Sequence, residues 1–220
     1  HSVPKLLSMN LSNPRRMAKL CGHLLTRPWR LPQYLRTSLT TRTPLDLSLP
    51  WWSQDAINAI ARWVTPETTV FEYGTGGSAL FLAKRAFSVE SVEDDEAWLG
   101  KTQATLDDGD LKNVNLHFEP FDFSCLDGFE QSSYINKLSR PHDLIVVDGQ
   151  DHYHFNQTLS ARTLCFRHAQ EHVQTGGIIL VDDSWRYPEI REISRCQKLV
   201  VHESTGPCRK GVTSTDLHYY

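Results

Sequence analysis

The stretch VFEYGTGGS at residues 70–78 decides the fold of this 220-residue chain. A short apolar strand, expected at 69–73, runs into a glycine-rich turn, and a helical pattern follows at 78–86. Glycine permits positive φ and lets a ligand approach the backbone without interference from a Cβ atom. The first turn of the following helix offers free N–H groups to anionic or polar ligand atoms. We therefore predict a ligand-binding crevice where this strand ends.

Strands and helices alternate beyond the glycine turn. Further strands are predicted at 88–93, 114–118, 143–148 and 178–181, and helices at 96–106 and 153–173. Such alternation indicates a parallel sheet with right-handed crossovers. The last two predicted strands, 198–202 and 212–219, are joined by a short turn and should be antiparallel. The expected fold class is α/β: a Rossmann-like, doubly wound, seven-stranded sheet, mostly parallel, with an antiparallel C-terminal β-hairpin.

The N-terminal part of the chain has a different charge from the remainder. We divide the chain into a basic arm, residues 1–50, and a domain, residues 51–220. The domain is strongly acidic, which argues against nucleic acid as the main substrate. Residues 1–45 contain no acidic side chain and eight basic ones, Lys5, Arg15, Arg16, Lys19, Arg27, Arg30, Arg36 and Arg42.

The arm allows several interpretations. Basic side chains can track phosphates, lie on an anionic membrane surface or belong to a targeting segment. The prolines and the lack of a clean amphipathic stripe weaken the membrane interpretation. We prefer an arm that folds across its own domain or across the second copy of a homodimer.

Cysteine usage and hydropathy bear on the location of the protein. The chain contains five cysteines and no C-x-x-C motif, which favours a reducing compartment, and we expect the cytoplasm. Its longest apolar runs are too short to span a bilayer, and no apolar h-region of a secretory signal is evident.

Two acidic residues mark the glycine turn as a nucleoside site. Glu72 lies two residues before Gly74, where a carboxylate can orient the cationic amino end of an aminoacyl-type cofactor. Glu93 ends the second strand, where a carboxylate can accept hydrogen bonds from both ribose hydroxyls of an adenosine. The turn also matches G-x-G-x-x-A, so an NAD-linked oxidoreductase is the alternative enzyme. A diphosphate-binding loop, however, gains nothing from a carboxylate at Glu72.

These residues resemble motif I of the class I S-adenosylmethionine-dependent methyltransferases, and Glu93 matches the ribose-binding acid of that family. Residues 143–149 and 176–182 resemble its fourth and fifth strands, so the similarity covers about residues 53–220 and leaves out the arm. Within the superfamily the chain is most similar to bacterial small-molecule or sugar methyltransferases. The resemblance implies a methionine site formed by Gly74, Thr75, Gly76 and Ser78, a ribose and adenine site at Glu93 and Asp94, and an adenine contact from Asp122.

Three carboxylates, Asp148, Asp182 and Asp183, follow the predicted strands 143–148 and 178–181. Strand ends of a parallel sheet share one edge, where ligands bind. Hard oxygen ligands suit Mg²⁺, and the arrangement resembles metal-assisted O-methyltransferases of the catechol and macrolide-sugar types. This sequence departs from them, because Gln150, Asp151 and His152 follow and no lysine takes the place of the catechol-type base. Solvated acids or direct hydrogen bonds to the substrate are the alternative to a magnesium site.

A hydroxyl acceptor needs a general base. Asp148 and His152 are the predicted catalytic residues, since both lie just past the fourth strand and histidine titrates near neutrality; His154 is a further histidine there. The expected function is methyl transfer from S-adenosylmethionine to an oxygen, less readily a nitrogen, of a small polar acceptor. The alternative from another class is a non-catalytic cofactor-binding module that acts through the arm.

Two other features have structural interpretations. Cys165, His168 and His172 share one face of a predicted helix and could bind zinc, although a core stripe is favoured. Trp51 and Trp52 precede the helix that Ser53 caps, so they either cover the active site or form a hydrophobic staple.

Overall fold

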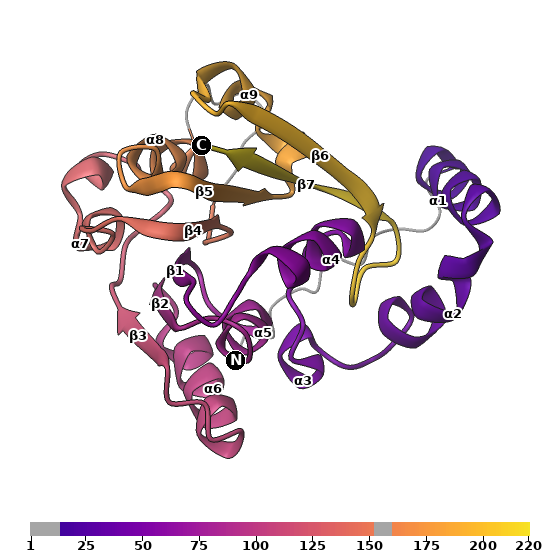
Figure 1. Ribbon diagram of the computed structural model, residues 1–220, viewed down its shortest axis with the longest axis horizontal. Coiled ribbons are helices and arrows are strands. Elements are labelled where there is room, and N and C mark those ends of the chain that lie inside the picture. Colours follow the sequence, from indigo (N-terminus) through magenta and orange to yellow (C-terminus); the bar gives the residue numbers. More distant parts are fainter. Residues whose placement is uncertain (1–13, 152–159) are drawn as a thin grey trace.

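The computed structural model describes residues 14–151 and 160–220. Its centre is one seven-stranded sheet in the order β3-β2-β1-β4-β5-β7-β6 (Figure 1). The strands are β1 (Thr69–Tyr73), β2 (Ser88–Glu93), β3 (Val114–Phe118), β4 (His142–Val147), β5 (Val173–Asp182), β6 (Lys198–Thr205) and β7 (Val212–Tyr219).

The strand directions confirm the predicted mixed sheet. β1 to β5 pair in parallel, whereas β7 lies antiparallel between β5 and β6. In this register Asp182 lies opposite Thr215. The antiparallel direction of β7 therefore brings the turn of the terminal hairpin to the carboxyl ends of the parallel strands.

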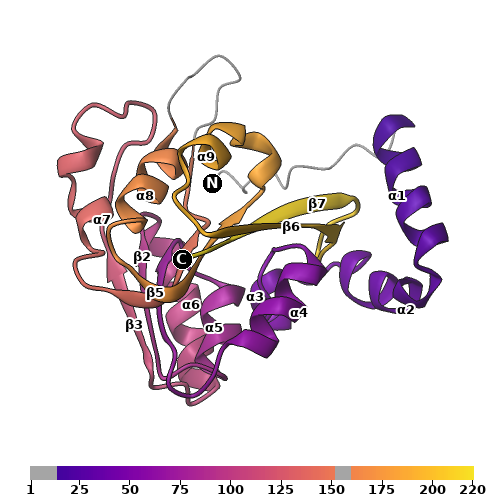
Figure 2. The ribbon, with the colours of Figure 1, turned by 45° about the horizontal axis from the view of Figure 1, so that its top comes forward.

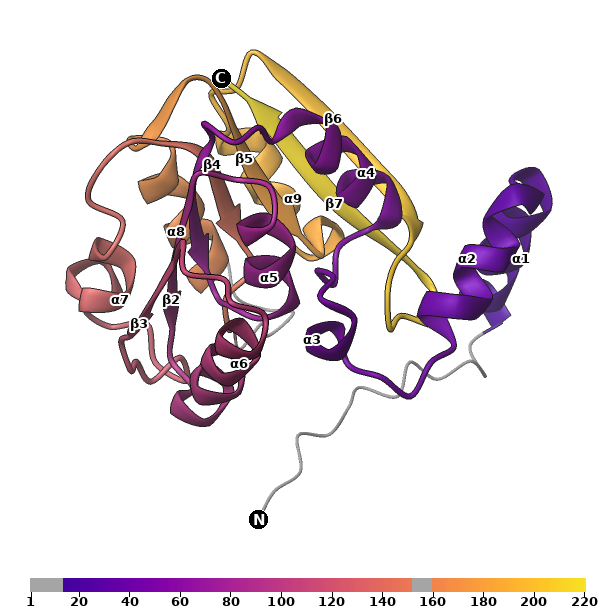
Figure 3. The same cartoon turned by 60° about the horizontal axis from the view of Figure 1, so that its bottom comes forward.

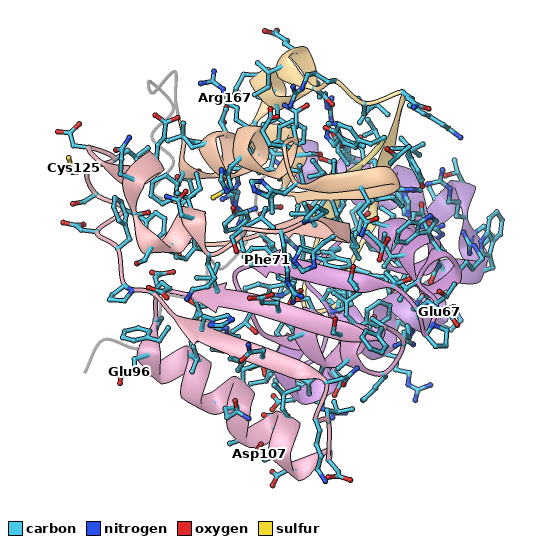
Figure 4. The ribbon with its side chains drawn as sticks, turned by 60° about the vertical axis from the view of Figure 1, so that its left-hand side comes forward. Glu67, Phe71, Glu96, Asp107, Cys125 and Arg167 are labelled. Atoms are coloured by element: carbon cyan, nitrogen blue, oxygen red, sulfur yellow. The ribbon has the colours of Figure 1, made fainter. Side chains whose placement is uncertain are left out.

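Alternating side chains along the strands build two cores. On β4, Ile145 and Val147 belong to one buried cluster, while Leu144 and Val146 belong to a second. Period-two alternation is what a strand buried on both faces requires. Figure 2 shows the two helical layers, and Figure 4 shows Phe71 within the sheet.

The helices of the domain cover the two faces of the sheet. They are α4 (Gln54–Trp63), α5 (Gly77–Ala83), α6 (Glu96–Asp108), α7 (Ser133–Asn136), α8 (Ala161–Ala169) and α9 (Pro188–Ile193). Ser53 caps α4, since its side chain accepts a hydrogen bond from the Ala56 amide. The helix predicted at 153–173 is wrong at its C-terminal end, because β5 already begins at Val173; residues 152–159 lie outside the described residues.

The arm contains α1 (Pro14–Thr26), α2 (Leu31–Gln33), a π-helical turn (Tyr34–Ser38) and α3 (Pro44–Leu47). Figure 3 shows α1 and α2 standing to one side of the sheet. The arm touches the hairpin turn: the Tyr34 hydroxyl donates to the Lys210 carbonyl at 2.9 Å, and the Ser38 hydroxyl donates to the Gly206 carbonyl at 2.8 Å. No helix in residues 14–151 or 160–220 is long and apolar enough to cross a membrane.

Candidate active site

The glycine turn after β1 meets the end of β4 backbone to backbone. Gly74 has a φ of +89°, and a Cβ atom there would lie 2.9 Å from the Gly149 Cα atom. Gly76 has a φ of +145° and lies under the Trp98 ring, which would be 3.1 Å from an added Cβ atom. Only glycine combines this φ with such close contact. Gly74 and Gly76 of the predicted turn are therefore required by geometry.

Glu72 is completely buried just before this turn. The Ser91 hydroxyl donates to Glu72 Oε2 at 2.8 Å, but Oε1 makes no hydrogen bond within the described part of the chain. Burial raises the pKa of Glu72 to about 8, against the lowering effects of the nearby Ser91 and Ser78 hydroxyls. A buried carboxylate oxygen without a donor is costly, so this position favours a hydrogen-bond donor supplied from outside the chain.

Glu93 holds the glycine turn and the start of α6. Its carboxylate accepts hydrogen bonds from the amides of Thr75 at 3.1 Å, Asp94 at 3.0 Å and Asp95 at 3.1 Å. Burial raises its pKa to about 7, although these backbone hydrogen bonds oppose the rise. The Trp98 indole donates to the Thr75 carbonyl at 2.8 Å, which fixes the turn from the other side.

The other predicted cofactor residues lie around the same turn. Ser78 is the second residue of α5, and Asp94 is half-buried directly after β2. Asp122 is exposed in the segment after β3, and its Oδ1 accepts a hydrogen bond from the Ser124 amide at 3.0 Å. Thr75 Oγ1 is buried and makes no hydrogen bond to any described residue.

Asp148 is paired with an arginine that sequence reasoning missed. Arg162 Nη2 lies 3.0 Å from Asp148 Oδ1, and the same guanidinium donates to the carbonyls of Gly149 at 3.0 Å and Asp182 at 2.9 Å. Burial raises the pKa of Asp148, and Arg162 counteracts this rise. The arginine, in the first turn of α8, thus joins the ends of β4 and β5.

Asp182 and Asp183 share a second arginine, which also escaped prediction. Arg209 donates through Nη2 to Asp182 Oδ2 at 2.6 Å and through Nη1 to Asp183 Oδ1 at 2.7 Å. The hydroxyls of Thr215 and Thr213 add hydrogen bonds at 2.7 and 2.8 Å. Burial dominates at Asp182 and raises its pKa to about 8. At Asp183 the charge of Arg209 outweighs burial and holds the pKa at about 2.

These pairings bear directly on the predicted magnesium site. Among residues 14–151 and 160–220, no three His, Cys, Asp or Glu side chains are arranged to hold a metal ion. The three predicted ligands do lie at the shared carboxyl edge, but arginines engage Asp148, Asp182 and Asp183. The described residues therefore do not fit a metal ion. The predicted base His152 and its neighbour His154 lie outside the described residues.

One sequence signal could have revealed Arg209. The predicted antiparallel hairpin requires its turn, residues 206–211, to reach the carboxyl edge, so a basic residue there should lie near Asp182 and Asp183. No comparable signal marks Tyr134, on the short helix α7. Its buried hydroxyl lies against Gly149 and makes no hydrogen bond within the described chain.

Trp51 and Trp52, predicted either to cover the active site or to form a hydrophobic staple, differ in burial. Trp52 is completely buried in one core with Ile57, as expected for the residues before and after a helix N-cap in a staple. Trp51 is half-exposed, and the Arg209 guanidinium carbon lies 5.9 Å from its ring centroid. Trp51 therefore lies at the edge of the aspartate cluster, Asp182 and Asp183, that Arg209 binds. Of the residues considered for zinc, Cys165 is buried in the core and His172 lies beyond the end of α8.

Solved structures share this architecture. A proposed O-methyltransferase from Klebsiella pneumoniae has a TM-score of 0.60 at 14% identity, covering 93% of this chain and 98% of its own. A proposed methyltransferase from Streptococcus mutans, in complex with SAH, has a TM-score of 0.54 at 14% identity, covering 82% of this chain and 100% of its own. The fold is that of the methyltransferases. An rRNA methylase from Streptococcus thermophilus has a TM-score of 0.51 at 16% identity, covering 82% and 98%. No protein-family model and no curated sequence matches the chain.

Proposed function

We propose that this chain transfers a methyl group from S-adenosylmethionine to an oxygen, less readily a nitrogen, of a small polar acceptor. The observation that carries the proposal is the buried Glu72, whose Oε1 makes no hydrogen bond to any described residue. The ammonium group of the cofactor is a donor of the required charge. Because that group is cationic, it would also favour the ionised form of a carboxyl whose pKa burial has raised.

The residues around the glycine turn fit the rest of the cofactor. Gly74, Thr75, Gly76 and Ser78 are assigned to its methionine part, since Thr75 Oγ1 is a further buried group that makes no hydrogen bond within the described chain. Carboxylate oxygens accept more than one hydrogen bond each, so Glu93 can hold the turn and still accept from ribose hydroxyls. Asp94 is assigned to the ribose and adenine side, and Asp122 to the adenine.

The chemistry needs positioning and the removal of one proton. When bound, the cofactor supplies an electrophilic methyl group on a sulfonium. A bond forms between the acceptor oxygen and the methyl carbon, the carbon–sulfur bond breaks, and S-adenosylhomocysteine leaves. We assign the acceptor proton to Asp148 or His152. The raised pKa of Asp148 makes it a better base than an ordinary carboxylate, and its pairing with Arg162 fixes its place beside the glycine turn.

The proposal of methyl transfer does not depend on which cation, Mg²⁺ or Arg209, neutralises Asp182 and Asp183. Magnesium assistance would require Mg²⁺ to displace Arg209 from both Asp182 and Asp183, where its forked geometry suits two carboxylates. This pairing favours arginine as the positive charge. We expect transfer to continue in EDTA; loss on chelation with recovery on adding Mg²⁺ would restore the metal assignment. All five cysteines are free, which supports the proposed cytoplasmic location.

Calorimetry with S-adenosylhomocysteine is the decisive experiment. We expect micromolar binding that Glu93→Ala abolishes and Glu90→Ala preserves. Glu90 is the matched control, because it lies three residues earlier on β2 and pairs with His117 and Arg140. Binding of NAD without S-adenosylhomocysteine would instead support the oxidoreductase. If the Asp148→Asn and His152→Ala variants both transferred methyl groups at the wild-type rate, these two residues would lose their catalytic assignment.

A further inference from the structure

The arm carries a ridge of exposed apolar side chains. Large hydrophobic residues are 80% exposed at Leu25 and 70% at Trp29, and the others of the ridge are Leu31, Leu35 and Leu39. Soluble proteins expose single apolar residues commonly, but five large ones within residues 25–39 are a concentration that favours an interaction site. The ridge is these five residues.

Three leucines of the ridge recur at helical spacing. Leu31, Leu35 and Leu39 are four residues apart, so they share one face of the segment that contains α2 and the π-helical turn. Tyr34 and Ser38, which lie between these leucines in the sequence, are buried and hydrogen-bonded to the hairpin turn. The three leucines themselves are exposed, in the part of the arm that projects in Figures 2 and 3.

Positive charge surrounds the ridge. Residues 14–45 contain seven arginines and lysines and no acidic residue. Two of these cations pair with the domain, Lys19 with Glu203 and Arg30 with Asp55. Arg36, next to Leu35 in the sequence, is exposed, and so is Arg42, whose guanidinium donates to the Asp46 carbonyl. Leucine and tryptophan on one face with flanking arginine and lysine is the composition of segments that lie in a membrane interface.

A second copy of the chain fits this ridge less well. Two arms packed face to face would place like charges against each other. The exposed large hydrophobics of the domain are scattered along its described residues and suggest no matching apolar patch; they are Trp51, Phe87, Phe118, Trp185 and Val201. An anionic bilayer provides both an apolar layer for the ridge and negative charge for its rim.

We propose that the arm binds the surface of anionic lipid membranes, with the ridge inserted between the headgroups and the flanking cations on the lipid phosphates. The arm does not span the bilayer in this arrangement. Because the same arm contacts the hairpin turn that carries Arg209, the docked protein would hold its acceptor edge close to the membrane. The inference does not depend on the proposed methyl transfer.

Vesicle co-sedimentation of the whole chain tests the proposal. We expect binding to vesicles that contain phosphatidylglycerol, no binding to phosphatidylcholine alone, and weaker binding at high salt. Trp29→Ser and Leu35→Ser should each lower the partition coefficient about tenfold, the effect of withdrawing one large apolar side chain from the interface. Phe87→Ser is the matched control, since Phe87 is an equally exposed apolar residue on the domain, and it should leave partition unchanged.

Thermal unfolding and S-adenosylhomocysteine binding check that each variant is folded. Equal binding to both vesicle types, or no loss in Trp29→Ser and Leu35→Ser, would overturn the proposal. It would also be overturned if light scattering showed a wild-type dimer that Leu35→Ser dissociates, because a second copy would then cover the ridge. Binding of RNA by the arm, in the absence of vesicle binding, would overturn it in favour of a nucleic-acid surface.

Discussion

Replacing Arg209 by methionine should destabilise the domain by about 3–5 kcal/mol, the cost of removing one partner from a buried ion pair. Arg209 neutralises the completely buried Asp182 and the nearly buried Asp183. Within the described residues, the other side chains that pair with them are the neutral hydroxyls of Thr215 and Thr213 and the more distant Arg186. A loss of this size is a large fraction of a typical stability of about 5–15 kcal/mol.

The loss should depend on pH in a direction that the geometry fixes. Burial raises the pKa of Asp182, and removing Arg209 raises it further. The folded state then keeps a proton that the unfolded state releases, so stability falls as pH rises from the unfolded pKa toward the folded one. Arg209→Met should therefore be more destabilised at pH 8 than at pH 5, and adding Asp182→Asn should remove most of this difference.

Urea unfolding followed by tryptophan fluorescence measures these quantities. For an m-value of about 2 kcal/mol/M, the midpoint should shift by roughly 2 M. Lys112→Met is the control, because Lys112 and Asp110 form an exposed pair whose removal should cost less than about 1 kcal/mol. A loss below about 1 kcal/mol for Arg209→Met, or one that is equal at both pH values, would refute the account of the aspartate cluster.

Three further predictions concern the glycine turn and a buried histidine. Gly74→Ala should lose about 1–2 kcal/mol to positive φ and further stability to the contact with Gly149, in thermal unfolding, whereas Gly128→Ala, at +74° in open space, should lose only the φ term. Binding of S-adenosylhomocysteine, by calorimetry, should tighten as pH rises toward 8 and Glu72 ionises, and Glu72→Gln should flatten that dependence; an unchanged pH profile would dissociate Glu72 from the cofactor. Burial lowers the pKa of His142 from 6.5 to about 4, so wild type should lose about 3 kcal/mol between pH 7 and 4 through this group, and acid unfolding of His142→Leu should lack that loss.

The sheet was predictable because its signals are local. Strands predicted at 69–73, 88–93 and 114–118 match β1, β2 and β3 residue for residue. Each strand is a short run between turn residues, so the sequence of the run itself is enough to predict it. The C-terminal end of the helix predicted at 153–173 failed, because β5 extends back past Gly176 and Gly177 to Val173, and glycines are poor markers of a strand interior.

The two halves of the candidate site, proposed for the cofactor and for the acceptor, also differed in how far the sequence could predict them. The cofactor half comes from one strand–turn–helix unit and from Glu93 on the next strand, so a contiguous stretch encodes it. In the acceptor half, Asp182 is paired with a residue 27 positions later in the chain. Acidic residues at strand ends, such as Asp182 and Asp183, indicate a site of negative charge. They do not indicate whether a magnesium ion or an arginine neutralises that charge.

The contact between Gly74 and Gly149 has a consequence for tracing the ancestry of this chain. An added Cβ at Gly74 would meet the Gly149 backbone, and one at Gly149 would meet the Tyr134 hydroxyl, so a side chain at either position requires a neighbour to move. The pair should therefore be inherited or lost together in descendants that keep the crevice. In distant relatives that keep the crevice, we expect glycine at both positions, after β1 and after β4, even where the surrounding sequence has changed.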